Sequence, residues 1–401
     1  MMLNKATLYL STILMGSCST MALANTITDA VTNGKTKVNM NLRYETVNQD
    51  NPLKDADAFT LRTRLTYQTA DFNRLSALVE FEDSRNVFGI DDYNNTLGKN
   101  TDYSVIADPE TTELDQFFLK YKLDSLTAKV GRQIITMDNH RFVGHVGWRQ
   151  DRQTFDGLTF DYQPIKDLSL KYGYITKRNR IFAQAKDINS NDHLINASYK
   201  TSLGKLTAYG YLLEVDNDTD NGLDTIGLRF NGSATLATQK LTYNLEYATQ
   251  SADTATTSYS TNYLSAELGT NISGISLKAG YELLGSDDGM YGFSTPLATL
   301  HKFNGWSDQF LSTPKEGLSD IYASVGGKLV GGKWALIYHK FDADQASATV
   351  DDLGSEINAV YTKKFNKHYL AGIKFASYSA GDTTSGKVDT NKVWLWVNAN
   401  F

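Results

Sequence analysis

The sequence lacks any uninterrupted apolar run of about 18 residues, although 41% of its residues are hydrophobic. This absence excludes a membrane protein built from transmembrane helices, because each such helix needs about 20 consecutive apolar residues. Proline is also scarce, with 5 residues against 23 tyrosines and 18 phenylalanines, which favours strands over helices or disorder. A transmembrane β-barrel remains allowed, because its strands need an apolar residue only at every second position.

The chain has a single cysteine, Cys18, and it lies in a segment that predicts a secretory signal peptide. Lys5 supplies the positive charge, residues 6–17 are largely apolar, and residues 22–24 form a small-residue cleavage site. A lipid-modified Cys18 is a minor alternative, because the residues before it form a poor lipoprotein signal. We therefore expect residues 1–24 to be a signal peptide and residues 25–401 to form one barrel domain without disulfides.

An excess of positive charge is missing as well. The chain has 39 basic and 45 acidic residues and a net charge of −6, and loss of Lys5 makes the mature chain one charge more negative. This balance argues against a basic nucleic-acid-binding protein, so we expect no nucleic-acid partner. Any preference for anions has to come from the local placement of Arg and Lys.

From residue 37 onward, apolar and polar residues alternate with a period of two. In residues 37–46 the apolar members are Val38, Met40, Leu42 and Tyr44. The same alternation returns in residues 59–68, with Phe59, Leu61 and Leu65 on one side and Arg62 and Arg64 on the other. Such a pattern indicates strands with one face in an apolar medium and the other in water.

Eighteen segments carry this pattern. They are residues 37–46, 59–68, 74–83, 113–123, 126–134, 154–163, 167–176, 193–202, 205–215, 223–231, 240–249, 259–270, 273–284, 318–330, 333–341, 355–364, 367–377 and 390–401. Short links alternate with longer polar ones, notably residues 84–112, 135–153, 177–192 and 285–317, and the link near 232–239 is longer than the other short ones. A soluble β-sandwich has no reason to place its long loops at one end. The pattern therefore predicts an all-β, single-chain transmembrane antiparallel β-barrel with short periplasmic turns and long outer loops, in a Gram-negative outer membrane.

The last segment has an unbroken apolar face, made by Val393, Leu395, Val397, Ala399 and Phe401. A terminal aromatic residue on such a strand is typical of the signal by which outer-membrane barrels are assembled. We therefore expect the barrel assembly machinery, membrane lipid and lipopolysaccharide as partners. The oligomeric state is left open.

The third outer loop carries a family resemblance. Its motifs are Gly131-Arg132-Gln133, residues 139–144 (NHRFVG), Trp148-Arg149-Gln150 and residues 153–157 (QTFDG). This stretch resembles the alginate-export-like outer-membrane porin family. The resemblance implies a barrel of the eighteen-stranded type and a pore for a solute, with an anionic saccharide as one candidate.

The same loop is rich in charge, and the third outer loop of many porins folds into the lumen. Candidate pore residues in this loop are Arg132, Asp138, His140, Arg141, His145, Arg149, Arg152 and Asp156. Arginine suits a pore for anions because it stays charged and offers a fork that matches carboxylate or sulfate oxygens. The alternative is that these arginines pair with carboxylates and fix the loop in place, and the sequence favours neither reading.

Charged residues on the polar face of predicted strands are expected to line the lumen wall. These are Arg43, Arg62, Arg64 and Lys129, opposed by Glu45, Glu80, Glu82 and Asp115. Opposed charges across a pore orient ionic and dipolar solutes. The alternative is a solvated lumen wall whose ion pairs are satisfied and which has no tuned selectivity. Charge on the lipid-facing side would cost about 2–4 kcal/mol at the membrane midplane, which supports the inward assignment.

Two other classes of site find little support. Residues 216–222 resemble a calcium-binding loop but lack its glycine at position six, and Gly227 stands where the bidentate glutamate belongs. The six histidines accompany no nucleophile motif and no metal-ligand spacing. We expect no catalytic residues, no metal and no cofactor.

The leading hypothesis is an outer-membrane porin whose water-filled channel admits small hydrophilic solutes, with anions and saccharides as candidates. The alternatives are a specific conduit for export or uptake of an alginate-like polysaccharide, and a surface binding or adhesion barrel. The sequence does not decide the solute, the direction of transport or the path of the third loop.

Overall fold

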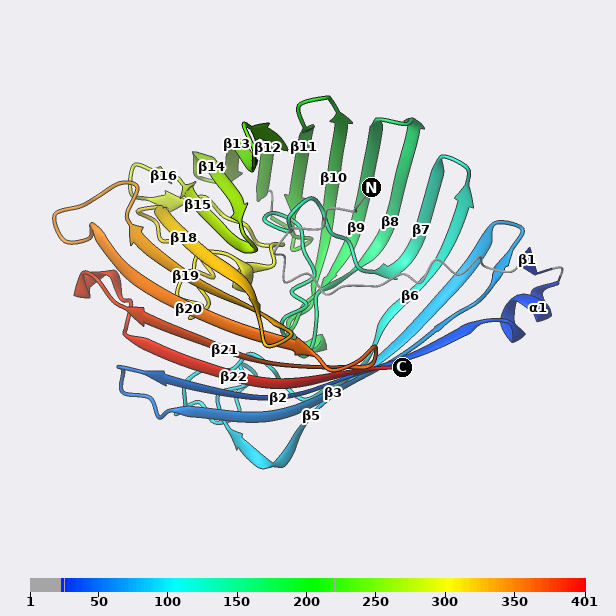
Figure 1. The fold of residues 1–401 in the computed structure, drawn as a ribbon, viewed down its shortest axis with the longest axis horizontal. Helices are drawn as coiled ribbons and strands as arrows, with labels where there is room; N and C mark the ends of the chain where they lie inside the picture. Colours follow the sequence, from blue (N-terminus) through cyan, green and yellow to red (C-terminus); the bar gives the residue numbers. More distant parts are fainter. Residues whose placement is uncertain (1–22, 25, 220) are drawn as a thin grey trace.

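The computed structural model describes residues 23–24, 26–219 and 221–401, and the predicted signal peptide lies outside this part except for its last residues. Eighteen long strands form the wall in the described part of the chain (Figure 1). They are β2 (Lys35–Gln49), β3 (Ala56–Gln68), β5 (Leu75–Asp92), β6 (Thr111–Leu123), β7 (Leu126–Gln133), β8 (Thr154–Ile165), β9 (Leu168–Asn179), β10 (Ile188–Lys200), β11 (Lys205–Glu214), β12 (Gly222–Leu236), β13 (Gln239–Asp253), β14 (Ser258–Ile272), β15 (Ile275–Leu284), β18 (Leu318–Leu329), β19 (Gly332–Asp342), β20 (Asp352–Lys364), β21 (Tyr369–Ser379) and β22 (Thr390–Asn400).

The sheet closes on itself, because β2 pairs antiparallel with β22 as well as with β3. Every other wall strand pairs antiparallel with its neighbours along the chain. Closure leaves no strand edge exposed to lipid, which is the condition for a sheet to span a membrane. The predicted eighteen-stranded barrel is confirmed. No helix among the described residues is both long and apolar enough to cross a membrane.

The remaining elements are short. They are β1 (Leu23–Ala24), α1 (Ile27–Thr32), β4 (Asp71–Phe72), η1 (Gln184–Lys186), β16 (Ser286–Asp287), β17 (Tyr291–Gly292), η2 (Leu300–Lys302) and η3 (Thr383–Ser385). A capping box between Thr26 and Asp29 starts α1. The backbone N–H of Ala70 donates to the carbonyl oxygen of Ala30, which fastens α1 beside the β3–β5 turn at the periplasmic end.

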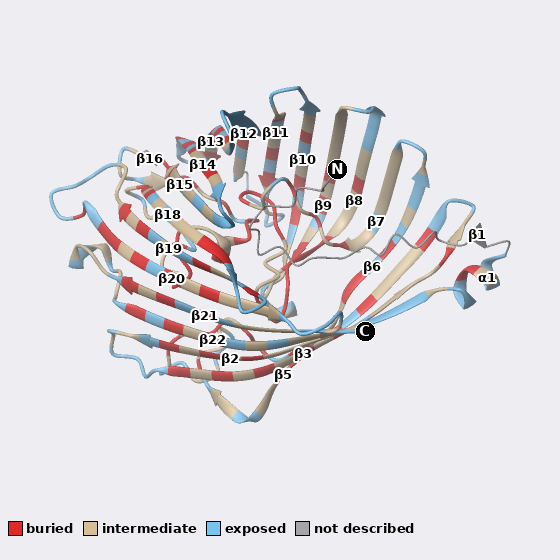
Figure 2. Ribbon diagram, in the orientation of Figure 1, coloured by how far each residue is buried: buried red, intermediate tan, exposed pale blue. Residues whose placement is uncertain are grey.

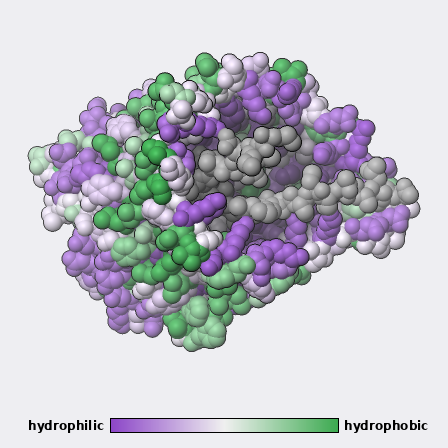
Figure 3. Space-filling model, in the orientation of Figure 1, coloured by the Kyte–Doolittle hydropathy of each residue, from purple (hydrophilic) through white to green (hydrophobic). Residues whose placement is uncertain are grey.

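The wall is apolar outside and polar inside, which is the reverse of a water-soluble protein with its apolar core and polar surface. On β13, Leu245 and Tyr247 are each 53% exposed on the outer face, whereas Glu246 between them is 3% exposed and faces the lumen. Figure 2 shows the resulting alternation of burial along the strands, and Figure 3 shows apolar residues gathered on the outer surface. On the last strand, Leu395 faces out and Trp394 is fully buried inside, as the predicted two-sided pattern requires.

Short turns and long loops lie at opposite ends, but two predicted boundaries are wrong. The short link near residues 232–239, expected to be longer than the other short ones, is a two-residue turn, because β12 continues to Leu236 and β13 begins at Gln239. The second outer loop is shorter than predicted, because β5 extends to Asp92. Neither segment keeps a regular alternation of apolar and polar residues, so periodicity alone does not reveal that their backbones still pair across the sheet.

Candidate functional site

The third outer loop, residues 134–153, folds into the lumen and crosses it from wall to wall. On one side, the Arg141 Nε atom lies 2.7 Å from Glu282 Oε1 of β15. On the other side, the Arg149 Nη1 atom lies 3.0 Å from Glu45 Oε2 of β2. Figure 1 shows this segment inside the ring of strands. The loop therefore narrows the channel, as expected of a porin constriction.

Apolar packing and backbone bonds fix the path of this inward loop. The ring of Phe142 contacts the rings of Tyr209 and Tyr263 at centroid distances of 5.3 and 5.1 Å. The Gly144 N–H donates to the carbonyl oxygen of Leu297, which belongs to the outer loop between β15 and β18. Phe142 is thus a packing anchor for the loop.

Arg149 lies in a network of buried charges on the β2 side. Besides Glu45, its guanidinium contacts Asp308 Oδ2 at 3.1 Å and Asp108 Oδ2 at 3.6 Å. Arg43 of β2 also donates to Asp108. Each of these five side chains is at least nine-tenths buried. The arginines are matched by carboxylates, so they fix the loop rather than offer free charge to a solute.

A second network joins the loop to β5 and β6. Arg152 donates to Glu80 and lies 2.6 Å from Asp115 Oδ2. Arg64 of β3 donates to Glu82 and lies 3.5 Å from the same Asp115 carboxylate. The wall residues predicted to face the lumen do so, but they are paired with one another and with the loop.

Two further predicted residues also lie inside. The carboxylate of Asp138 accepts hydrogen bonds from Asn196 Nδ2 at 2.7 Å and from Lys205 Nζ at 3.2 Å. Arg62 is buried and donates to the side-chain oxygen of Asn39. Both contribute to the polar interior of the barrel.

His140 and His145 pack edge to face, with ring centroids 5.3 Å apart. Burial of the imidazole lowers the pKa of His140 to about 4, and the charge of Lys302 acts in the same direction. Burial likewise lowers the pKa of His145 to about 3. Both rings are neutral at neutral pH, so they do not add positive charge to the pore under mild conditions.

The prediction that Arg132 and Asp156 line the pore is wrong. Arg132 lies opposite Phe117 in the sheet, and Phe117 is 52% exposed on the lipid-facing side. Its neighbour Gln133 is buried on the lumen side, so the strand alternation turns Arg132 outward. There the Nε and Nη2 atoms of Arg132 bind both carboxylate oxygens of Asp156, at 2.7 and 3.0 Å.

The loop between β15 and β18 also enters the lumen, which the sequence analysis did not foresee. Asp308 of this loop accepts from His301 Nδ1 at 2.6 Å and from Lys392 Nζ at 2.8 Å, in addition to Arg149. The backbone N–H groups of Trp306 and Ser307 donate to Glu356 of β20. The segment carries no charge pattern or motif that separates it from an ordinary outer loop.

A tryptophan cage lies where the two inward loops meet the wall. The Lys374 Nζ atom is 3.9 Å from the ring centroid of Trp306 and 4.2 Å from that of Trp148. The ring of Trp148 stacks on His301 with centroids 5.0 Å apart. These contacts make Trp148 a packing anchor and join the two loops.

Toward the periplasmic side of the inward loops, the lumen is basic. Lys129 lies near Lys120 and Lys171, with Asp161 as the nearby acidic residue. A second group joins Lys302 of the inner loop with Arg229 and Lys278 of the wall, with Glu267 beside them. Of these residues only Lys129 was predicted, because the others are scattered along strands without a motif.

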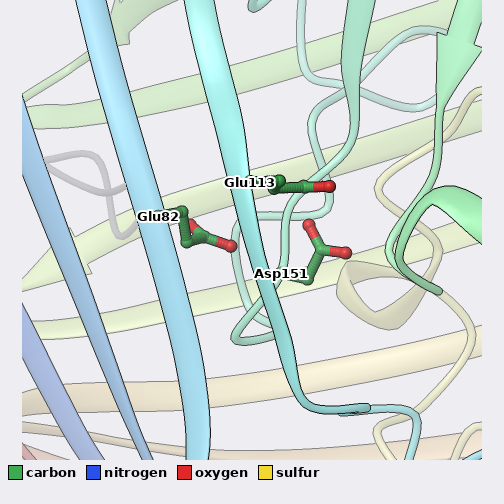
Figure 4. A group of neighbouring side chains, drawn as sticks. All are labelled: Glu82, Glu113 and Asp151. Atoms are coloured by element: carbon green, nitrogen blue, oxygen red, sulfur yellow. The ribbon is translucent and has the colours of Figure 1, made fainter.

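One group of carboxylates has a geometry suited to a metal ion among the described residues. It consists of Glu82, Glu113 and Asp151, drawn in Figure 4. Glu82 belongs to β5, Glu113 to β6 and Asp151 to the inward loop. Their separation in the sequence explains why spacing rules did not detect them.

Several solved structures share this fold at low sequence identity. OccAB4 of Acinetobacter baumannii is 15% identical with a TM-score of 0.72, covering 92% of this chain and 98% of its own. OccK9 (OpdG) of Pseudomonas aeruginosa is 14% identical with a TM-score of 0.72, covering 93% and 99%. OpdK of Pseudomonas aeruginosa, solved with vanillate, is 13% identical with a TM-score of 0.69, covering 92% and 98%. These likenesses confirm the fold.

No functionally curated protein matches the sequence. The sequence profile of the alginate export family, in contrast, matches residues 34–285, which is more than half of the chain and includes the whole inward loop 134–153. The match extends far beyond the motifs of the third outer loop, into the wall strands from β2 to β15. The chain therefore belongs to the alginate export family and is an eighteen-stranded β-barrel of the outer membrane.

Proposed function

We propose that the chain forms a water-filled porin channel that admits small hydrophilic solutes and favours anions. The observation that carries the preference for anions is the basic part of the lumen, on the periplasmic side of the inward loops. Six cations there face three carboxylates, Asp161, Glu246 and Glu267. The cations are Lys120, Lys129, Lys171, Arg229, Lys278 and Lys302. Since these charges lie in a channel with low-dielectric walls, their field raises the local concentration of anions.

The inward loops act in this proposal as a size filter. Their own arginines are matched by buried carboxylates, so selection by size and selection by charge belong to different parts of the channel. A carboxylate solute would pass the loops and then meet the lysines. OpdK, one of the structures with this fold, was solved with vanillate, which is a small aromatic carboxylate.

A specific conduit for an anionic polysaccharide is the second candidate. The family description, alginate export, favours it, since alginate is a polymer of sugar acids. The same lysines would attract such a chain, but the two inward loops crossing the lumen leave it a narrow path. A surface adhesion barrel is a third candidate that would use the outer loops alone. We assign the chain no enzymatic activity.

Planar-bilayer recording tests the proposal. The folded protein is expected to give stable unitary currents. In a potassium chloride gradient, the sign of its reversal potential should show a preference for chloride over potassium. Replacing Lys129 and Lys171 with Gln should move this potential toward the value of a cation-selective channel. The matched control replaces Lys54 and Lys315, whose side chains are 62% and 64% exposed in the outer loops. It removes surface charge and should leave the potential near that of the parent protein.

The outcomes separate the candidates. Unitary currents blocked by alginate oligomers but not by neutral oligosaccharides of equal length would favour the conduit. Absence of any current from a correctly folded barrel would contradict both channel functions and favour adhesion. A cation preference in the parent protein would overturn the assignment of the lysines.

We also propose that residues 1–24 are removed on export and that the C-terminal strand directs assembly by the barrel machinery. The outer face of the wall would then contact membrane lipid, and the outer loops lipopolysaccharide. A mature N-terminus at Asn25, read by mass spectrometry of the protein purified from outer membranes, is the expected result for the cleavage.

A further inference from the structure

Three carboxylates converge where the inward loop meets the wall. Glu82 and Glu113 are direct partners across β5 and β6, so their side chains leave the sheet on the same side. Asp151 approaches them from the loop, and Figure 4 shows the carboxylates pointing toward a common space. One oxygen from each of the three residues lies within 4.8 Å of the other two.

The hydrogen bonds of the protein leave two of these side chains incompletely satisfied. Glu82 accepts from Arg64 through Oε2, whereas its Oε1 is buried without a hydrogen-bond partner. Asp151 accepts from the Ala183 N–H through Oδ2 at 3.2 Å, and its Oδ1 has no partner. Both residues are at least 99% buried. A buried carboxylate oxygen without a partner is costly, so each of these atoms requires a ligand or a proton.

The surrounding charges do not compensate the cluster. Five carboxylates lie in contact or close interaction here, and three guanidinium groups face them. The carboxylates are Glu80, Glu82, Glu113, Asp115 and Asp151, and the guanidinium groups are Arg62, Arg64 and Arg152. Arg132 and Asp187 also act on Glu113, and their charges cancel. With all of these groups ionised, two negative charges remain, which is the charge that one divalent cation neutralises.

We propose that Glu82, Glu113 and Asp151 bind a divalent cation, with Ca²⁺ preferred over Mg²⁺. Calcium takes oxygen ligands at about 2.3–2.6 Å, so two ligands of one ion can lie up to about 5.2 Å apart, and the oxygens of this group lie within 4.8 Å of one another. Magnesium needs oxygens about 2.0–2.1 Å away in near-ideal octahedral geometry, which this spacing satisfies less well. Water would fill the remaining positions.

The ion would join the inward loop, through Asp151, to the wall strands β5 and β6. It would stabilise the position of the inward loop in the lumen, in addition to the ion pairs of the loop arginines. This inference concerns the chain itself and does not depend on which solute passes through the channel.

Isothermal titration calorimetry on the full chain, refolded in detergent and freed of metal with a chelator, tests the site. Titration with Ca²⁺ alone should give one saturable site, and Mg²⁺ should bind more weakly. The variant Glu113→Gln with Asp151→Asn should weaken Ca²⁺ binding by about tenfold or more. The matched control, Asp216→Asn with Asp218→Asn, removes the same charge from an exposed outer loop and should bind as the parent does.

The competing explanation is a proton shared between Glu113 and Asp151. It predicts no heat of Ca²⁺ binding in the parent protein, and this result would overturn the proposal, as would equal binding by the parent and the Glu113/Asp151 variant.

Because an unfolded variant would also fail to bind, folding is checked by the heat-dependent gel mobility of the barrel. If the variant does not fold, hydrogen exchange of the parent decides. Ca²⁺ must then slow exchange in residues 145–153 and leave residues 254–257 unchanged, and equal exchange with and without Ca²⁺ would reject the site.

Discussion

At the scale of single residues, the arginines of the inward loop are defined by their partners. Arg141 contacts Glu282, and Arg149 contacts Glu45, Asp108 and Asp308. Removing one member of such a buried pair leaves an uncompensated charge and typically costs about 3–5 kcal/mol. The sequence left two roles open for these arginines, and the geometry favours fixing the loop.

The double variant Arg141→Ala with Arg149→Ala is expected to release the loop. Unitary currents should become larger and noisier, and the reversal potential should shift toward cations because unpaired carboxylates replace ion pairs. Arg132→Ala is the control, since its guanidinium faces outward beside Asp156. Quiet currents and an unchanged potential in the double variant would contradict the fixing role.

The two loop histidines predict a dependence on pH. Their folded-state pKa values, about 4 for His140 and about 3 for His145, lie below the ordinary value of 6.5. As the pH falls from about 6.5, the unfolded chain takes up protons that the folded chain does not, so stability is lost down to about pH 3. Denaturant midpoints should therefore decrease between pH 7 and pH 4.

His145→Gln should flatten that decrease, because Gln cannot be protonated. His193→Gln is the matched control, since His193 pairs with Tyr174 on the outer face of the wall. If the parent and the His145 variant lose stability in parallel, the buried imidazoles are not the cause.

At the scale of elements, the last strand closes the barrel. The N–H of Phe401 donates to Val38 and the N–H of Val38 donates back to Phe401, at 2.9 and 3.1 Å. The Phe401 ring stacks on His368 with centroids 5.1 Å apart. These bonds lie at the seam between the first and last wall strands, where closure is completed.

Phe401→Ala is expected to lower the fraction of folded barrel in outer membranes, because the seam loses its terminal aromatic contact. Heat-dependent gel mobility of membrane fractions measures that fraction. Phe365→Ala, which removes a ring that is 63% exposed in a periplasmic turn, serves as the control. Equal folded fractions for the two variants would mean that the terminal ring has no special part in assembly.

At the scale of the whole molecule, charge selection is separated from the constriction. Liposomes containing the protein should therefore admit small carboxylates faster than neutral or cationic solutes of equal size. The difference should shrink at about 1 M salt, where the Debye length falls to about 3 Å. A preference that survives high salt unchanged would point to direct binding of the solute instead.

The sequence determined the wall of this protein. Alternation of apolar and polar residues fixes which side of each strand faces lipid, so strand number, closure and the inward direction of Arg43, Arg64 and Glu80 followed from local pattern. It also identified the third outer loop by its motifs. Arg132 and Asp156 were misplaced because they were grouped with the motifs of the loop, although both lie in predicted wall strands. The alternation of those strands decides the direction of their side chains.

Only the tertiary structure decided what fills the barrel. Loop residues have no periodicity, and their positions depend on partners far away in the chain, such as Asp308 for Arg149 and Glu282 for Arg141. The same holds for Glu82, Glu113 and Asp151, which come together only when the third loop enters the lumen and meets the closed wall. Short-range patterns specify strands, because a strand's environment repeats every two residues. A site inside the barrel, in contrast, forms only when closure of the barrel brings residues that are distant in the sequence together.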